Sequence, residues 1–201
     1  MLAATLEAMN EAGHWAEIVD DRWRWVAISD ELQRSGSGLR DTVDYPVGAF
    51  YFGPEAAAAR LAMRSGPTTS EISRRQFTGF GPWTLADLGG DRDALRAAVD
   101  EHLTDLVDGL GEDDGLPVRT LAQRGTGVTG LGEMAVPITG LRIRRADGRL
   151  AGTCLLFKPG VGMSAMATLT GHHDRRHVEH FGRVARPARR PSAILFADLE
   201  A

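Results

Sequence analysis

The stretch EMAVPITGLRIRRADGRLAGTCLLFK (residues 133–158) decides the fold class of this chain. Two runs rich in β-branched and other apolar residues, 133–145 and 149–158, flank the dipeptide Asp147-Gly148. Asp-Gly between such runs is a strong signal for a tight β-hairpin. In the first run the apolar residues change parity at Thr139-Gly140, which predicts a β-bulge there. We therefore expect an antiparallel sheet.

Two further strands are predicted near the start of the chain. Residues 14–20 and 23–29 are rich in Trp, Ile and Val, and a tight turn joins them. A short opening helix precedes them and ends at Gly13, because apolar residues recur at helical spacing up to that glycine. A single helical turn is predicted over residues 30–33.

The middle of the chain is predicted to be mainly helical. Pro54 is placed to begin a short alanine-rich helix that extends to Met63. Residues 65–90 are predicted to be irregular, because Gly-Pro occurs twice within them. The clearest helix covers 92–109, with Asp91 as its N-cap. Its apolar stripe consists of Leu95, Val99, Leu103, Leu106 and Leu110. Residues 117–123 are predicted to form another strand.

The predicted order is two strands, several short helices, one longer helix and three strands. This order is typical of an α+β fold, with an antiparallel sheet and the helices grouped on one face. The composition agrees with a globular domain, since 43% of the 201 residues are hydrophobic and 25% are charged. A net charge of −4 argues against a general nucleic-acid binder.

The chain is predicted to be cytoplasmic. It has no apolar run of about 18 residues that could span a membrane. Its first ten residues contain Glu7 and lack the basic region of a secretory signal. Its single cysteine, Cys154, excludes an internal disulfide and fits a reducing compartment. Because Cys154 has apolar neighbours in a predicted strand, we expect a buried, inert thiol.

Residues 10–160 resemble a PAS domain. Ala16-Glu17-Ile18-Val19-Asp20-Asp21, followed by Arg22-Trp23-Arg24-Trp25-Val26-Ala27-Ile28-Ser29, looks like the opening PAS hairpin. Ala146-Asp147-Gly148-Arg149 before a strand looks like the closing one. The resemblance implies a five-stranded antiparallel sheet whose two first and three last strands are separated by helices. A GAF-like sensor is the alternative.

A second resemblance lies at the end of the chain. Arg189-Arg190-Pro191-Ser192-Ala193-Ile194-Leu195-Phe196-Ala197-Asp198-Leu199-Glu200 looks like the entry into a class III adenylate or guanylate cyclase domain. The family resemblance implies that Asp198 would hold Mg²⁺ or Mn²⁺ in a full-length cyclase. The family's second metal aspartate and its transition-state residues have no counterpart in this chain. We therefore expect the chain itself to lack catalysis.

The two resemblances imply a sensor that regulates a cyclase. Residues 1–160 would be the PAS-like domain, 161–191 a linker with a signalling helix, and 192–201 the start of the catalytic domain. The locally basic segment 175–190 is predicted to be a solvated linker. The expected partners are a second copy of the chain and its own downstream cyclase domain. A ligand or partner would act by changing the arrangement of the dimer.

A small apolar or amphipathic ligand, or a partner domain, is expected to bind among the aromatic residues of the sensor. Most of the aromatic residues are predicted to form the core, and the set comprises Trp15, Trp23, Trp25, Phe50, Tyr51, Phe52, Phe77, Phe80 and Trp83. A pocket would draw its walls from these segments and from the helix that bears His102. The residues predicted to line it are Trp25, Phe52, Phe80, His102 and Leu106. His102 is either a structural residue or, as in some PAS sensors, a haem ligand.

Other patterns keep alternative interpretations open. His173, His177 and His180 would share one stripe of a helix, which suits a polar signalling face, a pH-responsive helix or zinc. The loop Gly125–Gly130 lacks the lysine of a phosphate-binding loop and is predicted to be a flexible connection. A ligand-free dimerisation module and a small stand-alone enzyme remain the rival functions.

Overall fold

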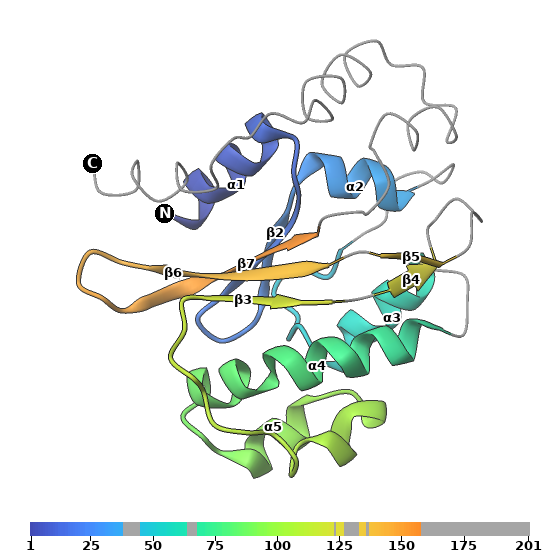
Figure 1. Cartoon of the computed structure of the whole chain (residues 1–201), viewed down its shortest axis with the longest axis vertical. Coiled ribbons are helices and arrows are strands. Elements are labelled where there is room, and N and C mark those ends of the chain that lie inside the picture. Colours follow the sequence, from blue (N-terminus) through green and yellow to red (C-terminus); the bar gives the residue numbers. More distant parts are fainter. Residues whose placement is uncertain (38–44, 64–67, 123, 127–132, 136, 158–201) are drawn as a thin grey trace.

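The chain folds around one five-stranded antiparallel sheet in the order β2-β1-β7-β6-β3 (Figure 1). The computed structural model describes residues 1–37, 45–63, 68–122, 124–126, 133–135 and 137–157. The strands of the sheet are β1 (Trp15–Asp20), β2 (Trp25–Ile28), β3 (Val118–Leu121), β6 (Ile138–Arg144) and β7 (Leu150–Phe157). The α+β, PAS-like class is confirmed. The predicted linker helix and terminal strand lie outside the described residues.

The first and last of these strands are neighbours at the centre of the sheet. β1 pairs with β7 antiparallel, so that Trp15 lies opposite Phe157 and Asp20 lies opposite Gly152. β2 then pairs with the other side of β1, and β6 and β3 extend the sheet beyond β7. The chain therefore leaves β7 beside the point where it enters β1.

The hairpin predicted at Asp147-Gly148 joins β6 to β7. Gly148 has a φ of 80°, which glycine adopts without strain, and its N–H donates to the carbonyl of Arg145 at 2.8 Å. The predicted strand 133–145 is divided, however. Its first part, β5 (Glu133–Ala135), pairs with β4 (Arg124–Thr126) in a separate two-stranded ribbon.

The bulge predicted at Thr139-Gly140 is wrong. β6 pairs regularly with β7 at these residues, and the register shift lies at Ile143/Arg144. The parity of the apolar residues changes because β6 is covered on both faces. Ile138 belongs to one core, whereas Leu141 and Ile143 face the other.

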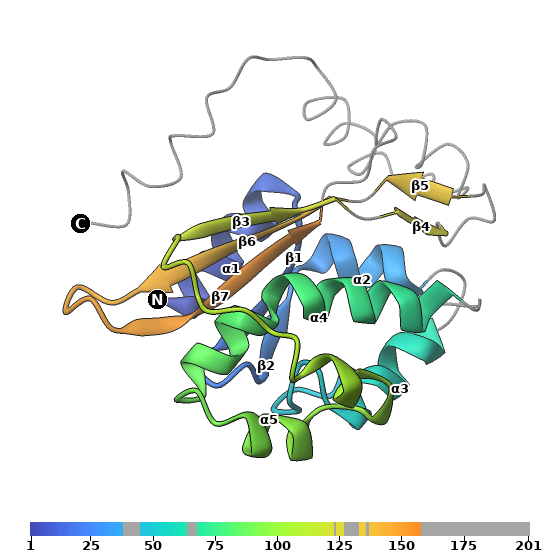
Figure 2. The same ribbon diagram turned by 60° about the horizontal axis from the view of Figure 1, so that its bottom comes forward.

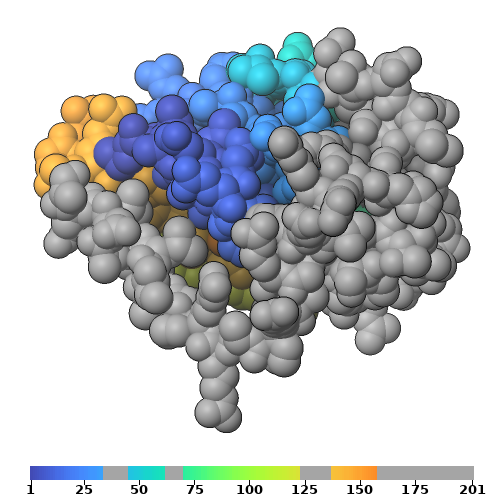
Figure 3. Space-filling view, turned by 90° about the horizontal axis from the view of Figure 1, so that it is seen from above, coloured from blue at the N-terminus to red at the C-terminus, as the bar shows by residue number. Residues whose placement is uncertain are grey.

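Helix α1 (Leu2–Ala12) covers one face of the sheet, here called the outer face (Figure 3). It packs Met9 against Ile18, Ile143 and Cys154 in a small core. Gly13 ends the helix in the left-handed conformation, with a φ of 65°. The helices were predicted to lie on one face of the sheet. In the structure α1 covers the other face.

The remaining helices form a layer on the opposite, inner face (Figures 1 and 2). They are α3 (Pro54–Met63), α4 (Thr68–Asp87), α5 (Arg92–Ala98) and the 3₁₀ helix η1 (Glu101–Leu106). A further helix, α2 (Asp30–Ser37), follows β2 and is longer than the predicted single turn; its Leu32 packs against the inner core.

The prediction that residues 65–90 are irregular is wrong, because α4 extends over twenty of them. Pro82 lies inside this helix and lacks an N–H, so it cannot donate the usual helical hydrogen bond to the carbonyl of Thr78. The helix persists because Phe77, Phe80 and Trp83 lie completely buried on its inner side. Their burial outweighs the cost of the proline.

The single helix predicted over 92–109 is also wrong, since α5 and η1 share that stretch. The chain bends at Asp100, whose N–H donates to the carbonyl of Phe52 at 2.8 Å. The Asp100 carboxylate then caps η1 by accepting from the N–H of His102. Asp91 caps α5 as predicted, and the apolar stripe does enter the core.

Candidate functional site

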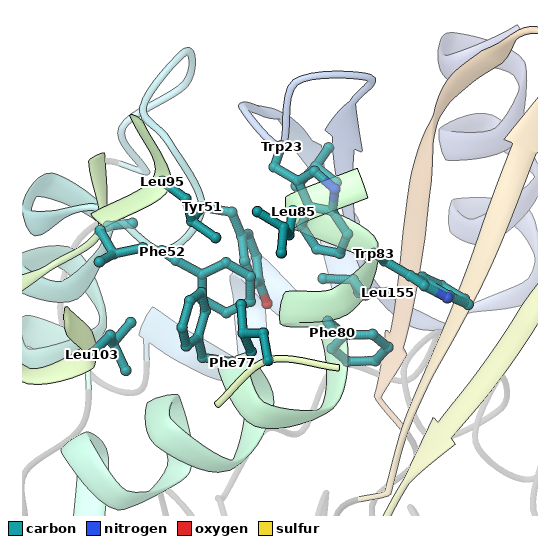
Figure 4. Close-up of a cluster of buried hydrophobic side chains, with 14 of the residues drawn as sticks. Trp23, Tyr51, Phe52, Phe77, Phe80, Trp83, Leu85, Leu95, Leu103 and Leu155 are labelled. Atoms are coloured by element: carbon teal, nitrogen blue, oxygen red, sulfur yellow. The ribbon is translucent and has the colours of Figure 1, made fainter. Parts of the chain in front are cut away.

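The space between the sheet and its helical layer is filled by aromatic side chains (Figure 4). Each member of the group is at most 1% exposed: Trp23, Tyr51, Phe52, Phe77, Phe80 and Trp83. The rings of Trp23 and Phe52 stack with centroids 5.7 Å apart, and Phe52 meets Phe77 edge-on at 5.0 Å. Such contacts add to the free energy gained by burial. We call this group the aromatic core.

The structure brings together four of the five predicted pocket residues. Trp25, Phe52 and Phe80 are buried in the inner core, and Leu106 packs against them while partly exposed. His102 is separate, because its ring pairs with the carboxylate of Asp100 and its side chain is 27% exposed. The four residues therefore contribute to packing, whereas His102 is a partly buried residue of η1 whose Nε2 has no hydrogen-bond partner among the described residues.

A buried ion network that was not predicted from the sequence lies at the end of α4. Arg142, on β6, donates to Asp87 at 2.5 Å and to Asp113 at 3.0 Å. The Arg142 side chain is 5% exposed and that of Asp87 is 8% exposed. The indole N–H of Trp23 donates to the second oxygen of Asp87 at 2.9 Å. We call Arg142, Asp87 and Asp113 the carboxylate clamp.

The clamp fixes the last turn of α4 to the sheet. Burial raises the pKa of the Asp87 carboxyl, and the hydrogen bonds from Trp23 and Arg142 oppose that rise. The centre of the Trp83 ring lies 4.8 Å from the guanidinium carbon of Arg142 and 5.1 Å from that of Arg119. Such contacts stabilise a cation beside a ring face. The sequence carried no distinct signal for this network, because Arg142 is one of two arginines in β6 and the other, Arg144, is exposed.

An open groove of about 510 Å³ runs between α4, η1 and β3. Leu106, a predicted pocket residue, lines it together with Arg74, Thr78 and Leu121. Arg74 is already paired, because its two terminal nitrogens each lie 2.7 Å from an oxygen of Asp105. The groove thus offers an apolar wall and two arginines, Arg74 and Arg75, each of which already has an acidic partner.

Cys154 is buried on the outer face, beneath α1, as the sequence predicted. Burial raises the pKa of its thiol to about 12. Because the thiolate is the reactive form, alkylation by iodoacetamide at pH 8 should be more than about 1,000-fold slower in the native protein than in denaturant. Mass spectrometry of timed samples measures both rates. Fast labelling of the native protein would show that α1 leaves the sheet.

Several predicted residues lie outside the described part of the chain. Asp198 and the histidines at 173, 177 and 180 are among them. Of the loop Gly125–Gly130, the structure describes only the first two residues, which belong to β4. Within the described ranges, no three His, Cys, Asp or Glu side chains are grouped so that they could hold a metal ion. No helix there has the length and apolar character needed to cross a membrane.

Comparisons with known proteins identify no family. No family model matches the chain, and no curated protein matches it. Among solved structures it is similar to the Vibrio cholerae VqmA dimer without target DNA, which is described as a LuxR-type receptor. The sequences are 11% identical, the TM-score is 0.39, and the match covers 80% of this chain and 52% of that one. The chain thus spans about half the length of VqmA, and a likeness this weak carries no functional argument.

Proposed function

We propose that this chain is the PAS-like regulatory part of a class III nucleotide cyclase. The observation that carries the proposal is the pairing of β1 with β7 at the centre of the sheet. It sets the end of α1 beside the point from which the chain continues toward the cyclase-like segment 189–200. A movement of α1 on the outer face would thus be felt at the end of β7, where the sensor joins its linker.

The domain would act on the arrangement of two copies of the chain. In class III cyclases, by family resemblance, the catalytic site forms between two catalytic domains. A ligand or partner that binds one dimer arrangement better shifts the population toward it, by no more than its differential affinity. The protein would be cytoplasmic, and the free thiol of Cys154 supports a reducing compartment.

The cyclase assignment is tested on the intact protein from the cells that produce it. An antibody against residues 1–157 recovers the protein, which is incubated with ATP or GTP and with Mg²⁺ or Mn²⁺. We expect formation of a cyclic nucleotide and its loss when Asp198→Ala is introduced into the gene, because one metal carboxylate is removed. A protein that forms no cyclic nucleotide, or an active Asp198→Ala variant, would refute the assignment.

The aromatic core favours a second candidate, a dimerisation module that needs no ligand. Its rings occupy the space where a sensor would hold an apolar molecule. Native mass spectrometry of the freshly purified chain separates the two candidates. Excess mass supports the sensor, and a dimer of apoprotein mass with no visible absorption supports the dimerisation module.

A further inference from the structure

Arg60 is a buried cation without a counter-ion in the described part of the chain. It lies on α3 and is 3% exposed. Its guanidinium carbon lies 4.1 Å from the ring centre of Tyr51 and 4.8 Å from that of Trp25. A buried charge that is not paired is strongly unfavourable in a protein interior. The two rings offset part of this cost, but they supply no negative charge.

Two hydrogen-bond donors at this position have no acceptor among the described residues. One nitrogen of Arg60, Nη1, donates to the carbonyl of Tyr51 at 2.7 Å, whereas Nη2 has no partner. The indole Nε1 of Trp25 also has none, and Trp25 is 2% exposed. Buried donors are nearly always bonded, and each one left without a partner is destabilising. Both donors belong to side chains that touch each other.

The nearest acid on β1 does not neutralise Arg60. Glu17 is 5% exposed and accepts a hydrogen bond from the Tyr51 hydroxyl at 2.7 Å. Burial, followed by the charge of Glu17, raises the pKa of that hydroxyl, so Tyr51 stays a neutral donor. Glu17 is thus engaged by Tyr51, and its carboxylate makes no described ion pair with Arg60.

We propose that Arg60 Nη2 and Trp25 Nε1 bind the carboxylate of a small ligand in this corner of the inner core. A guanidinium and a second N–H suit the two oxygens of a carboxylate, and charge-assisted hydrogen bonds of this kind are the stronger ones. The rings of Tyr51 and Trp25, with Tyr45 at 5.5 Å from Trp25, would contact the apolar part of such a molecule. The binding site is argued independently of the proposed function. The inference rests on that function only where it takes this ligand to be the signal that changes the dimer arrangement.

The test is a thermal-unfolding titration of the purified chain with sodium formate and sodium acetate. Acetamide serves as the neutral analogue and sodium chloride as the ionic-strength control. We expect a saturable rise in Tm with a carboxylate and none with acetamide or chloride at the same concentration, because only a carboxylate supplies both charge and two acceptors.

Two variants locate the effect. Trp25→Phe keeps the ring and removes one donor, so the Kd obtained from the titration should rise about tenfold. Arg60→Gln should abolish the rise in Tm. Arg75→Gln is the matched control, since Arg75 is half exposed and pairs with Glu71 on the surface. It should bind like the unmodified chain.

Three outcomes would overturn the inference. These are no saturable rise with either carboxylate, an equal rise with acetamide or chloride, or an unchanged Kd in Trp25→Phe. The Trp25→Phe variant decides the matter if Arg60→Gln does not fold. The cyclase assay measures product formed by the intact protein and its Asp198→Ala variant, whereas the titration measures the Tm of the purified chain. A failure of the cyclase assignment can therefore be distinguished from a failure of the carboxylate site.

Discussion

Replacing Arg142 with alanine should lower the free energy of unfolding by about 3–5 kcal/mol. The substitution leaves the carboxylates of Asp87 and Asp113 without their shared cation, and the Asp87 side chain is only 8% exposed. It also removes a cation from the face of the Trp83 ring. Urea denaturation followed by far-ultraviolet circular dichroism measures the change.

A paired substitution and a neighbouring arginine control this result. Arg142→Met with Asp87→Leu removes the most deeply buried ion pair and keeps similar volume, so it should recover part of the lost stability. The recovery is incomplete because Asp113 still lacks its cation and the indole N–H of Trp23 loses its acceptor. Arg144→Ala lies on the same strand, where Arg144 is exposed, and should change stability by less than about 0.5 kcal/mol. A loss under 1 kcal/mol in Arg142→Ala would mean that the clamp does not hold α4 to the sheet.

The second large effect concerns the contact between Phe80 and Gly140. Phe80→Ala should cost about 3–5 kcal/mol, because it empties the centre of the aromatic core. Gly140→Ala should cost about 1–3 kcal/mol, because the new Cβ would lie 2.6 Å from Cε1 of Phe80. The double variant should lose less than the sum by about 1 kcal/mol or more, since removing the ring makes room for the methyl group.

A double-mutant cycle in urea measures this coupling. The new Cβ would also lie 3.0 Å from Trp83, so some cost should remain in the double variant. Gly111→Ala is the control, because a Cβ there meets no atom within 4 Å. Strictly additive losses in the cycle would contradict the placement of β6 against α4.

The elements whose signals are local could be predicted from the sequence. The turn at Asp147-Gly148, the end of α1 at Gly13 and the cap at Asp91 each depend on a few neighbouring residues, and the structure contains all three. Helix α4 could not be predicted in this way. Pro82 opposes a helix locally, and only burial against the distant sheet decides the outcome.

The polar groups of the inner core were beyond sequence reasoning for a related reason. Arg142 lies 55 residues from Asp87 in the chain, and Arg60 on α3 meets Trp25 on β2, with α2 between them in the sequence. An isolated arginine in a strand or an alanine-rich helix ordinarily reaches solvent. The aromatic residues were predicted to be mostly core, because large apolar rings are costly to expose wherever they lie.

The sheet cannot be completed while the chain is still being synthesised short of residue 157. β1 emerges early but finds its central partner, β7, more than a hundred residues later. Until then its only described strand partner is β2, and a two-stranded hairpin is marginally stable in water. Non-local pairing of this kind slows folding toward the millisecond-to-second range. Until β7 is made, the nascent chain therefore exposes one unpaired edge of β1. We expect chaperones at the ribosome to bind this exposed strand.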